Sequence, residues 1–113
     1  MSVFQQIQKV REELHIALKE SKALGEKFAL SKAKYEGVKS RCVLELKEQG
    51  YSASIIEQII KGVPDVNDAL LDVLTTEVQY KNACEAINVW KKEYDYLREQ
   101  YQREWSQSGW SDR

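Results

Sequence analysis

An unbroken apolar repeat occupies the first forty residues and limits what the chain can fold into. Apolar or small residues recur there at alternating steps of four and three, which places them on one face of an α-helix. Neither proline nor strand-like alternation interrupts the segment. It is too charged for a buried core helix, so the pattern predicts a coiled-coil helix over residues 3–49. The predicted seam consists of Val3, Ile7, Val10, Leu14, Ala17, Ser21, Leu24, Phe28, Ser31, Tyr35, Val38 and Cys42.

A short central segment ends this helix and begins two others. Gly50 follows the last periodic residues and predicts a left-handed C-cap. Ser54 and Glu57 have the spacing of a capping box, which predicts a short helix over residues 53–61. Pro64, followed by an acidic residue, is typical of a helix start.

The third predicted helix covers residues 65–105 and repeats the spacing of three and four. Residues 106–113 lack periodicity and predict a flexible tail, so residues 1–105 form the single predicted domain. One position of the seam stays open between two neighbours. The predicted seam is Val66, Leu70, Val73 or Leu74, Tyr80, Ala83, Ile87, Trp90, Tyr94, Leu97 and Tyr101.

Two helices of similar length joined by a short tip predict an all-α fold, a long antiparallel helical hairpin. If the helices pair symmetrically about the tip, the numbers of facing residues sum to about 114. Phe28 then lies near Ile87, Tyr35 near Tyr80, and Leu14 near Tyr101.

A second apolar line lies on the far side of the predicted hairpin and predicts self-association. Its members follow a heptad period without a charged residue, and two of them are small enough for close helix approach. We expect a dimer that forms a four-helix bundle, while scattered surface apolar residues are the alternative. The line comprises Ile16, Ala23, Leu30, Gly37 and Leu44 on the first helix, with Val89 and Tyr96 on the third.

Composition excludes several classes of protein. The 113 residues carry a net charge of −1, and 42% of them are hydrophobic, which argues against a disordered chain. Neither a signal peptide nor a membrane span is recognisable, so we expect a cytoplasmic protein with Cys42 and Cys84 reduced. In the predicted hairpin these cysteines lie about 18 Å apart, too far for a disulfide.

Catalytic and metal-binding motifs are weak. Glu12 and His15 have the spacing of a helical di-iron motif, but Leu14 lies on the seam and turns both outward. The single histidine has no plausible nucleophile beside it, and the glycines form no phosphate-binding loop. We therefore expect a non-enzymatic protein with no catalytic residue, no metal and no cofactor.

A basic segment favours nucleic acid as an alternative partner. It contains seven basic and three acidic residues, whereas residues 51–75 contain one basic and four acidic residues. Such asymmetry is typical of a phosphate-binding surface but also of an ordinary solvated helix. The basic residues are Lys19, Lys22, Lys27, Lys32, Lys34, Lys39 and Arg41.

The tip is more apolar than one short helix requires. Part of it must cap the hairpin seam, and the remainder predicts a patch that binds a partner protein. The patch comprises Tyr51, Ile55, Ile56, Ile59 and Ile60.

The tip and the end of the third helix together resemble a known group of proteins. Residues 46–56, with their Gly50-Tyr51-Ser52 turn, residues 60–62, 80–81 and 101–105 are similar to small helical proteins encoded by temperate bacteriophages. The genes of that group lie among replication and recombination genes. The resemblance implies an accessory role in phage DNA metabolism, exerted through contact with another protein, and supplies no catalytic residue.

Overall fold

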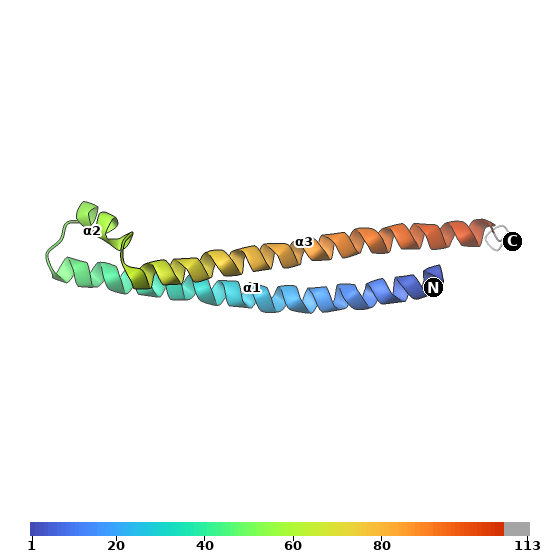
Figure 1. Ribbon diagram of the computed structural model, residues 1–113, viewed down its shortest axis with the longest axis horizontal. Coiled ribbons are helices and arrows are strands. Elements are labelled where there is room, and N and C mark those ends of the chain that lie inside the picture. Colours follow the sequence, from blue (N-terminus) through green and yellow to red (C-terminus); the bar gives the residue numbers. More distant parts are fainter. Residues whose placement is uncertain (108–113) are drawn as a thin grey trace. The chain divides into compact units, whose positions relative to one another are not determined.

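The computed structural model describes residues 1–107, which contain three α-helices and no strand (Figure 1). They are α1 (Val3–Glu48), α2 (Ala53–Ile60) and α3 (Pro64–Gln107). The predicted all-α fold is therefore confirmed, and each predicted helix boundary lies within two residues of the observed one. Helix α3 continues into the predicted tail as far as Gln107, and residues 108–113 of that tail lie outside the described part.

The chain divides into two units. The tip unit is Ala23–Lys81, and the terminal unit combines Met1–Lys22 with residues 82–107. Within each unit α1 and α3 run antiparallel, as Figure 1 shows, and in the tip unit α2 lies at the turn between them. The antiparallel pairing of a helical hairpin is thus present in both units, and its connection through α2 lies in the tip unit.

The α1 seam is correctly predicted along its whole length. All twelve predicted residues are buried or half-buried, and Val10 and Ala17 are the most enclosed. On α3, Val73 is buried whereas Leu74 is 51% exposed, so Val73 takes the position that the sequence left open.

Two buried residues of α3 were missed. Ala69 and Thr76 are each only 4% exposed, and they complete an even heptad spacing from Val66 onward. Leu70, predicted for the position that Ala69 takes, is half-buried beside the seam. The Thr76 hydroxyl donates to the carbonyl oxygen of Asp72 at 2.7 Å, which satisfies it inside the seam. A search for apolar residues alone overlooks such a threonine, because its side chain is polar and is buried only with its hydroxyl bonded to the helix.

Helix α2 folds back onto the end of α1 and forms the core of the tip unit. Ile56 and Ile60 of α2 and Val66 of α3 are all below 9% exposed. Partly buried side chains from the last turns of α1 and from the α2–α3 linker surround them: Tyr35, Val38, Cys42, Val43, Leu46 and Val63.

This packing shifts the helix register, and the predicted pairs of facing residues are wrong. The ring centroid of Phe28 lies 6.1 Å from that of Tyr80, seven residues before Ile87, its predicted neighbour. In the terminal unit Tyr101 packs on Phe4 at 6.3 Å rather than on Leu14. Because α2 and its linker cover the last turns of α1, α3 begins beside earlier α1 residues than symmetric pairing assumes.

Of the two predicted helix caps, one is confirmed and one is wrong. Gly50 has φ +92°, which confirms the left-handed C-cap, and the Tyr51 amide donates to the Leu46 carbonyl oxygen at 3.2 Å. The predicted capping box at Ser54 is wrong, because α2 begins earlier, after Ser52, and has no side-chain cap bond.

A capping box exists instead at the start of α1. The Gln5 amide donates to Ser2 Oγ, and the Ser2 amide donates to Gln5 Oε1, both at 3.1 Å. The spacing of Ser2 and Gln5 in the sequence is that of a capping box, but the start of the helix was predicted from the apolar repeat beginning at Val3 alone.

Candidate interaction surfaces

A groove lies at the tip where the end of α1, α2 and the start of α3 meet. Its volume is about 700 Å³, within the range of small-ligand and peptide pockets. All its lining residues belong to the tip unit. They are Tyr35, Lys39, Val43, Lys47, Ala53, Ile56, Glu57, Ile60, Lys61, Val66, Asn67 and Leu70.

The groove is apolar with a basic border. Lys39, Lys47 and Lys61 contribute three positive charges, against the single negative charge of Glu57. The Lys39 ammonium lies 5.7 Å from the centroid of the Tyr35 ring, a cation–π contact that holds it beside the groove. Lys47 and Lys61 form no ion pair within residues 1–107.

The predicted tip patch divides into core and surface. Ile56 and Ile60 are buried in the tip core, and of their side chains only small exposed parts line the groove. Tyr51 and Ile55 are exposed, and Ile59 is half-buried. The helical period of α2 turns Ile56 and Ile60 inward and leaves Ile55 outward.

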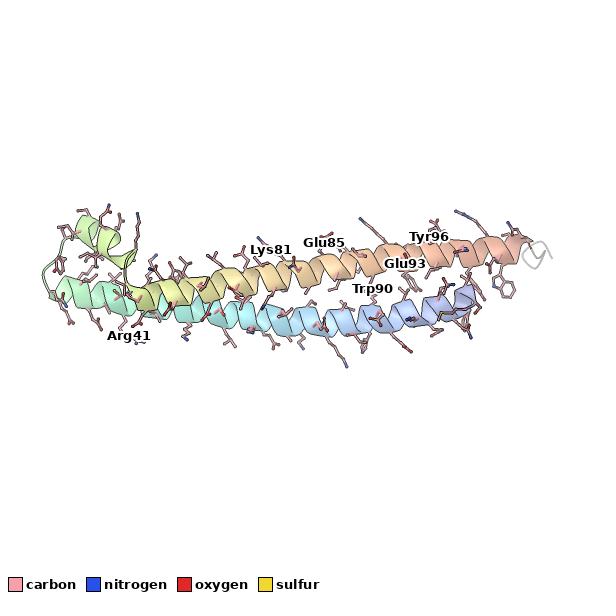
Figure 2. All side chains as sticks on the ribbon, viewed as in Figure 1. Arg41, Lys81, Glu85, Trp90, Glu93 and Tyr96 are labelled. Carbon is pink, nitrogen blue, oxygen red and sulfur yellow. The ribbon has the colours of Figure 1, made fainter. Side chains whose placement is uncertain are left out.

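The predicted self-association residues all lie on the surface. None of them is buried in its own unit, and among the large side chains of the set Leu30 is the most exposed at 72%. In the terminal unit, Figure 2 shows Tyr96 on the side of α3 away from α1, whereas Trp90 points toward α1. The exposed set is Ile16, Ala23, Leu30, Gly37, Leu44, Val89 and Tyr96.

Sequence reasoning missed three further exposed apolar residues of α3. Leu71, Leu74 and Val78 are each more than half exposed. Their spacing of three and four residues places them together on one side of α3. The same spacing is present in the sequence, but Leu74 was considered there only as a possible seam residue.

The basic residues of α1 lie on two sides of the helix, because helical spacing separates Lys32 and Lys39 from the other five. Six of the seven predicted residues are exposed, and Lys39 is half-buried. Lys32 lies over the Phe28 ring at 5.3 Å, next to the seam. Heptad spacing places Lys27 and Lys34 on the other flank of the helix. Part of this basic charge therefore borders the hairpin seam itself.

The acidic side of α3 complements these lysines. The Glu77 carboxylate pairs with the Lys81 ammonium at 2.7 Å, and this hydrogen bond and charge hold the pKa of Glu77 below its ordinary value. The positive charge of Lys32 on α1 lowers the pKa of Glu77 further, while partial desolvation opposes both effects. The tip unit as a whole is nearly balanced, with eight basic and nine acidic residues.

The described residues offer no metal or thiol centre. Glu12 and His15 are exposed, as predicted from the seam position of Leu14. Within residues 1–107, no three side chains of the histidine, cysteine and acidic types lie close enough together to hold a metal ion. Cys42 and Cys84 are both free thiols, as predicted.

The chain matches no protein-family model, and neither curated proteins nor solved structures give a significant match. The resemblance to phage-encoded helical proteins thus stays a prediction from the sequence. No helix within residues 1–107 is both long and apolar enough to cross a membrane.

Proposed function

We propose that this chain is a non-enzymatic helical interaction protein that assembles with itself and contacts another protein. Following the resemblance of its sequence, we assign it to the cytoplasm of a phage-infected cell, as an accessory factor in phage DNA replication or recombination. The observation that carries the proposal is the set of exposed apolar residues outside the packed seams.

Charge favours a second copy of this chain as the occupant of that surface. Leu30 on α1 of the tip unit has two basic residues, Lys27 and Lys34, and one acidic residue, Glu26, about one turn away on either side, a surplus of one positive charge. Leu71 on α3 instead has the acidic Asp68 one turn before it. An α1 from one copy therefore complements an α3 from another in both apolar and charged contacts. A two-fold dimer uses each contact twice, which forms a four-helix bundle.

Light-scattering mass during size-exclusion chromatography tests self-association. The wild type is expected at twice the 13.1 kDa mass of one chain. Leu30→Glu places a charge inside the proposed contact and is expected to give a monomer. Ala29→Glu introduces the same charge about 100° away on α1, at a position that is also exposed, and should stay dimeric. A monomeric wild type, or equal masses for the two variants, would refute the dimer.

Direct nucleic-acid binding is the second candidate, favoured by the six exposed basic residues between Lys19 and Arg41. If all seven basic residues of the segment met phosphates of a single strand, the logarithm of the binding constant would fall with the logarithm of salt concentration with a slope of about −5. Anisotropy of a labelled single-stranded oligonucleotide measures that slope. An apolar protein contact depends far less on salt, so the same salt series on a protein complex separates the two candidates.

A further inference from the structure

We infer that the tip groove binds an amphipathic peptide segment of a partner protein, whose apolar side chains are flanked by acidic residues. This inference rests on the proposed function, because it names the chemistry of the partner protein and the place of contact. The groove lies within the tip unit and does not involve the exposed apolar residues assigned to self-association.

The floor of the groove supplies the apolar part of the contact. Val43 packs against the buried Ile56, Ile60 and Val66, and Leu70 lines the same groove, yet both are only half-buried. Their exposed parts face a space of about 700 Å³ that the chain does not fill. An apolar side chain of a partner gains about 25 cal/mol for each square ångström that it removes from water there.

The border of the groove determines the charge of the partner. Three lysines and one glutamate leave a surplus of two positive charges around an apolar floor. Lys47 and Lys61 have no carboxylate partner within the described chain, so both can pair with acidic side chains of a ligand. Glu57 disfavours a second carboxylate close to α2, which limits how the acidic residues of the ligand can be placed.

Contacts between the helices hold the backbone around this border in place. Lys39 is held over the Tyr35 ring, and Lys61 follows directly on the last turn of α2. The Asn67 side-chain amide donates to the Lys61 carbonyl oxygen at 3.1 Å, which links the end of α2 to the first turn of α3. A pre-formed groove binds a peptide with less loss of side-chain freedom than a flexible surface does.

The apolar floor favours a peptide over nucleic acid. Phosphates need cations and hydrogen-bond donors, and buried aliphatic side chains offer neither. Base stacking requires aromatic faces, but Tyr35 is the single aromatic residue lining this groove, and Lys39 covers its ring. Leucine or isoleucine side chains with neighbouring carboxylates fit both parts of the site.

Fluorescence anisotropy with designed peptides tests the inference. The probe is a fluorescein-labelled, 16-residue helical peptide that carries leucines at positions i, i+3 and i+7 and glutamates on both flanks. A second peptide carries lysine in place of each glutamate, and a third carries alanine in place of each leucine. The glutamate peptide is expected to bind, and both altered peptides are expected to bind at least about tenfold more weakly.

A matched pair of double variants locates the site. Lys47→Glu with Lys61→Glu reverses the two unpaired border charges and should weaken binding of the glutamate peptide by about tenfold or more. Arg11→Glu with Arg98→Glu makes the same change in net charge in the terminal unit, outside both the groove and the self-association residues, and should leave the affinity within about twofold. All four residues are exposed, so circular dichroism of both variants should match the wild type.

Several results would overturn the inference. The peptide could fail to bind, the lysine peptide could bind equally well, or both double variants could weaken binding alike. Tighter binding of a labelled single-stranded oligonucleotide, abolished by the Lys47 and Lys61 changes, would reassign the groove to nucleic acid. Light-scattering mass of the same samples distinguishes failure of the groove assignment from failure of the proposed self-association. A dimer that does not bind the peptide refutes only the groove assignment.

Discussion

Replacing Ile56 by alanine removes the most deeply buried side chain of α2. Ile56 is 4% exposed and packs in the tip core, whereas its neighbour Ile55 is 48% exposed. Truncating a buried isoleucine to alanine costs about 2–5 kcal/mol, and the larger values belong to sites that cannot collapse. The tip core is small and has an open groove beside it, so we expect about 3 kcal/mol for Ile56→Ala.

Ile55→Ala is the matched control, because it deletes the same atoms from the same helix. About half of the Ile55 side chain already meets water, and alanine favours the helix more than isoleucine does. We therefore expect a loss of less than about 1 kcal/mol for Ile55→Ala.

Urea unfolding followed by circular dichroism at 222 nm measures the difference at one fixed protein concentration. With a denaturant slope of about 1–3 kcal/mol per molar urea, Ile56→Ala should lower the midpoint by about 1–3 M. At the same slope the midpoint of Ile55→Ala should fall by no more than about a third of that shift. Equal midpoints for the two variants would show that α2 does not pack on α1 and α3 through Ile56.

Three smaller changes test the helix ends and the ion pair. Ser2→Ala removes one bond of the α1 capping box and should cost about 1 kcal/mol, seen as faster amide exchange in the first turn of α1; unchanged exchange would refute the cap. Gly50→Ala should cost about 1–2 kcal/mol in thermal unfolding because its φ of +92° disfavours any side chain, whereas Gly37→Ala, in an open helix position, should stabilise by about 0.5–1 kcal/mol. Because the Glu77 pKa is lowered in the folded state, its pair with Lys81 stabilises the fold above about pH 4.5, and this contribution disappears as the pH falls through the lower folded pKa. Glu77→Gln should therefore reduce the fall of the thermal unfolding midpoint between pH 5 and pH 3. An equal fall in the variant and the wild type would show that the pair does not stabilise the fold.

The periodicity of the sequence predicted the helices and most of the seam, because a repeat of three and four over forty residues specifies both the helix and its buried side. Ala69 and Thr76 escaped that pattern, since a small residue and a hydroxyl carry little hydropathy of their own. Thr76 is buried at low cost because its hydroxyl bonds to its own helix.

The register could not be predicted from the lengths of the helices. It depends on how α2 folds back, and so on contacts such as Ile56 and Val66 with Tyr35 that join residues far apart in the sequence. The position of the tip groove likewise depends on how α2 folds back, since its twelve lining residues come from all three helices and the α2–α3 linker. A list of apolar residues near the tip could not separate Ile56, in the core, from Ile55, on the surface.

The contact between Gly25 and Tyr80 favours one register of the two long helices of the tip unit. A Cβ atom on Gly25 would lie 3.0 Å from Cε1 of Tyr80, so the ring occupies the space that a side chain would take. One heptad away in either direction α1 carries Leu18 or Lys32, whose side chains would meet the ring after a slip of seven residues. A repetitive seam alone permits such slips at little cost, because each step exchanges one apolar contact for another. A single missing side chain thus selects one of several near-equivalent alignments, and with it the position of the tip groove.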